Sequence, residues 1–150
     1  VWIMTFPNGL LAYRIIRGKF KSGDYIAMLQ DKLVPCMKLN YGETFYFQED
    51  NCSVHKARIV KQFMKEQYVN VLEWPSKSPD LNIVEDVWKL ISDLVYDRNS
   101  FKNKNELEEA VLDALKYVQT NKMNTILDLY KSIRKRLCTV LSKQGNLYNK

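Results

Sequence analysis

Strand-like and helix-like segments alternate from Thr44 onward, and this order constrains the fold more than any other feature of the sequence. Residues 44–48 have the alternating aromatic pattern of a half-buried strand, and residues 69–74 form a second strand-like run. A helical pattern lies between them at residues 53–67, with Ser53 as its cap. This order predicts an α/β fold with at least one parallel pair of strands.

The rest of the pattern predicts a hairpin at the start of the chain and helices elsewhere. Apolar runs at residues 1–6 and 10–16 flank Pro7-Asn8-Gly9, which is a turn sequence. Because the chain begins in mid-pattern at Val1, we expect it to start inside a domain. Apolar residues three and four positions apart predict four further helices, at residues 22–33, 82–96, 104–119 and 124–144. The first of these is capped by Ser22 and is expected to stop near Pro35.

Composition fits one soluble globular domain, because 46% of the 150 residues are hydrophobic and 27% are charged. No apolar run approaches the length of a membrane span, and residues 1–7 lack the basic leader of a secretory signal. The three cysteines are widely spaced and predict neither a disulfide framework nor a zinc cluster. These features favour an intracellular protein that is neither secreted nor bound to a membrane.

The net charge of +6 is unevenly distributed. Residues 1–97 contain 12 basic and 12 acidic residues, whereas residues 98–150 contain 11 basic and 5 acidic ones, so the whole excess is C-terminal. A basic tail fits contact with DNA phosphates, because charge neutralisation supplies most non-specific DNA affinity. An ordinary solvated helix face is an equal alternative. The basic residues of the last predicted helix and the residues after it are Lys131, Arg134, Lys135, Arg136, Lys143 and Lys150.

Two carboxylates occupy positions where α/β sheets place functional groups. Asp50 follows the strand at residues 44–48, and Glu85 lies in the first turn of the helix at residues 82–96. The 34 residues between them suffice for a crossover that brings both side chains to one edge of a sheet. Clustered carboxylates bind Mg²⁺ or Mn²⁺ and support phosphoryl transfer. Alternatively, Asn82 and Glu85 form a capping box, in which Glu85 only satisfies a backbone amide.

Two longer motifs surround these carboxylates. Residues 47–55, Phe-Gln-Glu-Asp-Asn-Cys-Ser-Val-His, resemble the block around the second acidic residue of Tc/mariner transposases. Residues 74–88, Trp-Pro-Ser-Lys-Ser-Pro-Asp-Leu-Asn-Ile-Val-Glu-Asp-Val-Trp, are similar to the third-acid block of that family. The 34-residue interval matches the branch whose third acid is Glu. Further similarity at residues 1–2, 16–18 and 130–136 extends the resemblance over essentially the whole chain.

The resemblance implies a DDE catalytic domain with an RNase H-like mixed sheet flanked by helices. Three acidic residues of such a domain bind Mg²⁺ or Mn²⁺, cut DNA and join the freed 3′ end to a target. Asp50 matches the second acid and Glu85 the third, so both are expected to be catalytic metal ligands. The first acid has no match, because it belongs to a central strand before Val1 and no acidic residue precedes Asp24. We therefore expect residues 1–150 to be an N-terminally truncated catalytic domain without its first central strand, with a helical basic tail from about residue 104.

The same resemblance implies DNA as the partner, both transposon ends and target, together with a nuclear location and a homodimer of the full-length protein. The DNA-binding helix-turn-helix region expected upstream is missing as well. Without the first acid and the central strand, we expect little or no cleavage by residues 1–150 alone and open strand edges that favour aggregation. Two alternatives remain: a non-catalytic DNA-binding or assembly module derived from a transposase, and a decayed element with no selected role.

Six residues are further candidates for DNA contact, and each has a structural alternative. The single histidine can touch DNA or the metal shell, or it can form a structural hydrogen bond at a helix start. The asparagine beside the second acid can orient a phosphate, or it can simply form a turn. The basic side chains can contact phosphates or remain solvated. These candidates are Asn51, His55, Lys77, Arg134, Lys135 and Arg136.

Overall fold

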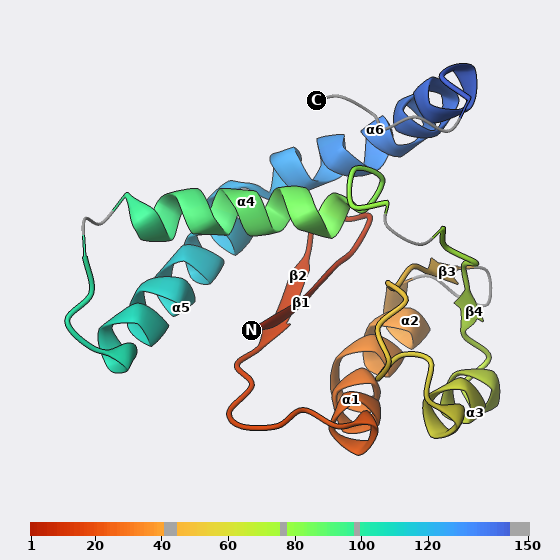
Figure 1. Cartoon of the computed structure of the whole chain (residues 1–150), viewed down its shortest axis with the longest axis horizontal. Coiled ribbons are helices and arrows are strands. Elements are labelled where there is room, and N and C mark those ends of the chain that lie inside the picture. Colours follow the sequence, from red (N-terminus) through yellow and green to blue (C-terminus); the bar gives the residue numbers. More distant parts are fainter. Residues whose placement is uncertain (41–44, 76–77, 98–99, 145–150) are drawn as a thin grey trace. The chain divides into compact units, whose positions relative to one another are not determined.

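The computed structural model describes residues 1–40, 45–75, 78–97 and 100–144, which combine helices with short strands (Figure 1). The α/β prediction is therefore confirmed. The chain forms two compact units. The first unit contains Val1 and Arg14–Lys77, and the second unit contains Trp2–Tyr13 and Ser78–Lys150.

The first unit contains the predicted parallel strand pair. Strand β3 pairs with β4 so that Tyr46 lies opposite Asn70 and Phe47 opposite Val71. The amide of Leu72 donates to the carbonyl of Phe47 at 2.9 Å, which extends the pairing beyond β4. Both strands are shorter than predicted, and Thr44 lies outside the described residues. The elements of this unit are α1 (Ser22–Met28), η1 (Leu29–Leu33), α2 (Val34–Asn40), β3 (Tyr46–Phe47), α3 (Arg58–Glu66) and β4 (Asn70–Val71).

Pro35 does not stop the first helix, contrary to the sequence prediction. After α1 the chain continues through η1, a π-helical segment, into α2, where Pro35 is the second residue. Inside a regular α-helix a proline removes one backbone hydrogen bond, and its ring clashes with the carbonyl four residues earlier. The wider π-helical turn changes the hydrogen-bond register just before the proline. The helical region therefore extends to Asn40.

Helix α3 begins later than predicted, at Arg58, and Ser53 does not cap it. The residues before it form turns, in which the amide of Lys56 donates to the carbonyl of Cys52 at 3.1 Å. The helix ends in a Schellman arrangement, in which the amide of Val69 donates to the carbonyl of Met64 at 2.9 Å. Tyr68 takes the left-handed position of that cap, with φ at 55°.

The second unit begins with the predicted hairpin, in which β1 (Trp2–Thr5) pairs with β2 (Leu11–Arg14). Its turn is closed by the amide of Phe6 donating to the carbonyl of Leu10 at 2.9 Å. Three helices follow, and the first two begin at asparagine caps whose side chains accept backbone amides: Asn82 from Val84, and Asn103 from Glu106. The helices are α4 (Ile83–Tyr96), α5 (Lys104–Asn121) and α6 (Met123–Ser142).

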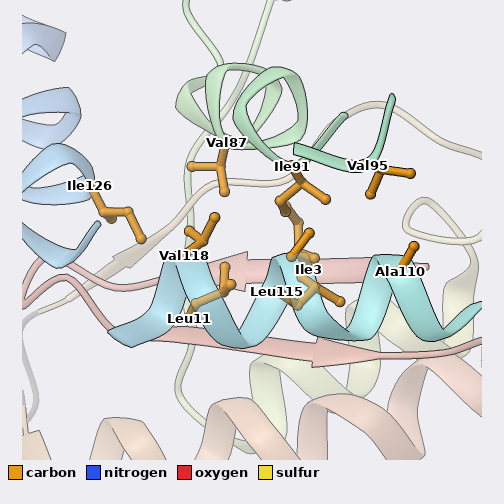
Figure 2. Packing of buried hydrophobic residues seen from close by; sticks show 10 residues of the cluster. Ile3, Leu11, Val87, Ile91, Val95, Ala110, Leu115, Val118 and Ile126 are labelled. Atoms are coloured by element: carbon orange, nitrogen blue, oxygen red, sulfur yellow. The ribbon is translucent and has the colours of Figure 1, made fainter. Parts of the chain in front are cut away.

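The core of the second unit lies between the hairpin and these three helices (Figure 2). The hydroxyl of Tyr130 in α6 also donates to the carbonyl of Thr5 at 2.7 Å, which ties the last helix to the hairpin. This packing fixes α4, whose first turn carries Glu85, against the rest of the unit. The buried residues of this core are Ile3, Leu11, Val87, Ile91, Val95, Ala110, Ala114, Leu115, Val118 and Ile126.

The strands of the described residues form two two-stranded sheets, β1–β2 and β3–β4, whereas the resemblance led us to expect one mixed sheet. The β3–β4 ladder is short, and Tyr46 within it is 72% exposed. None of the helices that the structure describes has the length and apolar character needed to cross a membrane.

Candidate functional site

Asp50 lies just after β3 and combines an exposed carboxylate with a fixed orientation. Its side chain is 62% exposed. The Oδ1 atom accepts the backbone amide of Cys52 at 3.0 Å and lies 2.7 Å from Nδ1 of His55. An ionised carboxylate can only accept, so His55 carries a proton on Nδ1 in this contact. The structural hydrogen bond that the sequence left as the alternative for His55 is thus present.

The side chains of Tyr25 and Glu49 are largely buried and lie next to His55. The hydroxyl of Tyr25, which is 1% exposed, donates to Oε2 of Glu49 at 2.6 Å. The rings of Tyr25 and His55 lie 4.4 Å apart between centroids. Burial raises the pKa of Glu49, although the Tyr25 hydrogen bond and the nearby His55 act in the opposite direction. Burial, together with the charge of Glu49, also raises the pKa of Tyr25. The hydrogen-bonded pair of Tyr25 and Glu49 therefore packs against His55 through the Tyr25 ring, and His55 in turn contacts Asp50.

Asn51 connects the ends of the two parallel strands. Its Nδ2 donates to the backbone carbonyl of Trp74 at 3.0 Å. Trp74 follows β4, so this bond joins the segment after β3 to the segment that leads toward the second motif. Asn51 is thus engaged in holding the first motif in place.

Tyr25→Phe is expected to lower the free energy of unfolding by about 1–3 kcal/mol, because it leaves the mostly buried Glu49 carboxylate without this donor. Urea denaturation followed by circular dichroism measures the loss. Tyr46→Phe is the matched control, since Tyr46 is 72% exposed and should change stability by less than about 0.5 kcal/mol. Equal losses in the two variants would refute the proposed support by Tyr25.

Glu85 lies in the first turn of α4 in the second unit, and it is exposed. The backbone cap is made by Asn82, whose carbonyl accepts the amide of Glu85 at 3.0 Å. Within the residues that the structure describes, the Glu85 carboxylate makes no hydrogen bond or ion pair. The capping role that the sequence offered as an alternative is thus not seen in this part of the chain. Asp86, the next residue, is instead bound to Arg136 at 2.7 Å.

The basic candidates for DNA contact fall into different environments. Arg134 and Lys135 are exposed on α6. Arg136 is only 5% exposed and is bonded to protein groups of α4 and α6. Its guanidinium is engaged inside the protein, so we do not retain Arg136 as a DNA contact. Lys77 lies outside the described residues.

Sequence reasoning did not identify Tyr25 or Asp86 as parts of the site. The only signal for Asp86 is its position beside Glu85, and Tyr25 fits the apolar spacing of the helix predicted at residues 22–33. Among the described residues, no three His, Cys, Asp or Glu side chains are grouped so as to hold a metal ion. Asp50 belongs to the first unit and Glu85 to the second.

The comparisons with known proteins agree with the two acidic motifs. A family model described as DDE superfamily endonuclease matches residues 2–108. The chain is 29% identical over 150 residues to the transposable element Tc3 transposase of Caenorhabditis elegans. The aligned region covers 99% of this chain and 45% of that protein. It is 30% identical over 121 residues to the Tcb2 transposase of Caenorhabditis briggsae, covering 81% of this chain and 43% of that protein.

The chain thus spans less than half the length of these two relatives. The match to the family model nevertheless includes both acidic motifs, at residues 47–55 and 74–88. The family that these motifs indicated is confirmed. The chain belongs to the DDE superfamily of endonucleases, within the Tc/mariner group of transposases.

Proposed function

We propose that Asp50 and Glu85 are two of the carboxylate ligands of a divalent metal centre in a protein that cleaves DNA and joins the freed 3′ end to a target. The observation that carries the proposal is the contrast between neighbouring acids at the start of α4. Asp86 is bound to Arg136, whereas Glu85 is exposed and has no partner within the described residues. DNA as partner, a nuclear location and pairing of two copies in a full-length protein follow from the same resemblance.

The donor set fits a hard cation such as Mg²⁺ or Mn²⁺, which prefers carboxylate oxygens. Both hydrogen bonds of the Asp50 carboxylate within the described residues use Oδ1, which leaves Oδ2 for an ion. His55 then acts as an outer partner that orients Asp50, a common arrangement around metal ligands. When bound, the ion would stabilise the charge that develops on phosphate oxygens during cleavage.

We further propose that the chain has the RNase H-like mixed sheet flanked by helices that the resemblance implies. The parallel register of β3 and β4 supports this arrangement. The carboxyl ends of parallel strands meet at one edge of a sheet. Asp50 follows β3, and the segment leading to Glu85 follows β4, so each motif comes after the carboxyl end of one of the parallel strands.

The chain matches two of the three acids that the resemblance implies. Two-metal phosphoryl transfer depends on a complete set of ligands. We therefore expect residues 1–150 by themselves to bind a divalent ion and to cleave little or no DNA. Nicking of a terminal-repeat duplex by this chain with Mg²⁺, abolished by Asp50→Ala, would contradict that expectation.

Mn²⁺ titration of residues 1–150, followed by electron paramagnetic resonance of the free ion, tests the metal centre. Asp50→Ala and Glu85→Ala are each expected to weaken binding by more than about 100-fold, because removing a ligand costs more than removing an outer partner. Asp93→Ala is the matched control, since it removes another exposed carboxylate from α4. Binding that persists in both variants, or that falls equally in the control, would overturn the proposal.

A second candidate function, a non-catalytic DNA-binding module, is favoured by the exposed pair Arg134 and Lys135 in the basic part of the chain. Duplex binding measured by fluorescence anisotropy at several salt concentrations separates the two functions. The double variant Arg134→Gln/Lys135→Gln is expected to reduce the salt slope by about 2 if both side chains contact phosphate. DNA affinity that is unchanged by Asp50→Ala and by chelation of divalent ions would favour the DNA-binding module over the metal centre.

A further inference from the structure

The first turn of α4 is held by a buried arginine from the last helix. Arg136 of α6 is 5% exposed, and its Nη1 lies 2.7 Å from Oδ2 of Asp86. The same nitrogen donates to the backbone carbonyl of Asp80 at 2.9 Å, and Nε donates to Oγ of Ser132 at 2.9 Å. Asp80 and Asp86, the two partners of Nη1, lie on either side of Glu85 in the sequence. The guanidinium therefore joins α6 both to the turn before α4 and to the first turn of α4.

These bonds constrain the backbone around Glu85 from both sides. The Asp80 carbonyl belongs to the turn that precedes the Asn82 cap, and Asp86 is the residue after Glu85. Figure 1 shows α6 passing the start of α4, and the two helices pack against each other within the second unit. A charged pair with side chains only 6% and 14% exposed holds a defined geometry, because both groups depend on each other for solvation.

The pair also separates the roles of two adjacent acids. With its carboxylate held by Arg136, Asp86 is turned toward α6, while Glu85 is left exposed on the helix. We propose that Arg136 is a positioning residue for Glu85, which makes the last helix a part of the metal centre. This inference rests on the proposed function of Glu85 as a metal ligand.

The test compares the Mn²⁺ affinity of two variants that each lose one positive charge. Arg136→Gln is expected to weaken Mn²⁺ binding by about 10- to 100-fold, the range typical for removal of a partner that orients a ligand. Lys116→Gln also removes one positive charge from the second unit, but at an exposed position of α5. Because solvent and salt screen an exposed charge, this control should change affinity by less than about threefold.

A second pair of variants asks whether the hydrogen bond, rather than the charge of Asp86, is what positions Glu85. Asp86→Ala and Asp86→Asn remove the same negative charge, but only asparagine keeps an oxygen that can accept from Arg136. Asp86→Ala should weaken Mn²⁺ binding by about 10-fold or more, whereas Asp86→Asn should restore the affinity to within about threefold of the unchanged chain.

The outcomes distinguish the two proposals. If the unchanged chain binds no Mn²⁺, or if Glu85→Ala leaves the Mn²⁺ affinity unchanged, the proposed function is wrong. If binding requires Glu85 while folded Arg136→Gln binds as tightly as the unchanged chain, the positioning role is wrong. If circular dichroism shows that Arg136→Gln is unfolded, the Mn²⁺ affinities of Asp86→Ala and Asp86→Asn test the positioning role instead. Equal affinities of these two variants would overturn the inference.

Discussion

Arg136→Met is expected to lower the free energy of unfolding by about 3–5 kcal/mol, the cost of leaving one member of a buried ion pair without its partner. Methionine keeps much of the aliphatic packing of arginine, so the loss reports mainly on the guanidinium. Asp86, with a side chain 14% exposed, would then have to hold its charge with little access to water. Urea denaturation of residues 1–150 measures the change.

Arg134→Met is the control for this prediction, because Arg134 is exposed on the same helix and should change stability by less than about 0.5 kcal/mol. The double variant Asp86→Leu/Arg136→Met should recover much of the loss, since replacing both charges removes the uncompensated one. A recovery would assign the cost of the single variant to the unpaired carboxylate. A double variant as unstable as the sum of its two single variants would contradict this account.

Gly9→Ala is expected to destabilise the chain by about 2–5 kcal/mol, which combines backbone strain of about 1–2 kcal/mol with overpacking of about 1–3 kcal/mol. Gly9 has φ at +84° in the hairpin turn. A Cβ there would overlap the side chain of Met123 and lie 2.9 Å from its carbonyl oxygen. That carbonyl belongs to the first residue of α6, so it cannot move away without moving the helix.

Gly18→Ala isolates the two parts of this effect. Gly18 has a similar φ of +82°, but a Cβ there meets nothing within 4 Å. This variant should therefore lose only the strain, about 1–2 kcal/mol. Thermal unfolding of the two variants side by side measures the difference. Losses of equal size would mean that α6 does not pack closely on the hairpin turn.

Local sequence signals predicted several elements because the residues that decide them are neighbours. Pro7-Asn8-Gly9 predicted the hairpin turn, and Asn82 predicted the start of α4, as its side chain now accepts the amide of Val84. The strand, helix, strand order predicted the parallel pairing of β3 with β4. The two acidic motifs predicted the family, which the match over residues 2–108 confirms.

Local signals failed where two of them competed. Pro35 is a helix breaker by itself, yet the π-helical segment before it changes the hydrogen-bond register, and the helix continues through the proline. Ser53 is a good cap by residue type. However, Asp50 already accepts the amide of Cys52 just ahead of it, and the chain forms turns until Ala57. Which signal prevails depends on hydrogen bonds that the pattern alone does not rank.

By itself the sequence determined the family, the class of fold and the positions of two acids, one after a strand and one in the first turn of a helix. Only the tertiary structure decided how the neighbouring charges are used. Composition placed Arg136 among the DNA contacts, but packing pairs it with Asp86, 50 positions away. Tyr25 likewise meets Glu49 across 24 positions. Such pairs form because burial removes water from a charged or polar group, and the partner that replaces the water is chosen by the fold rather than by sequence neighbours.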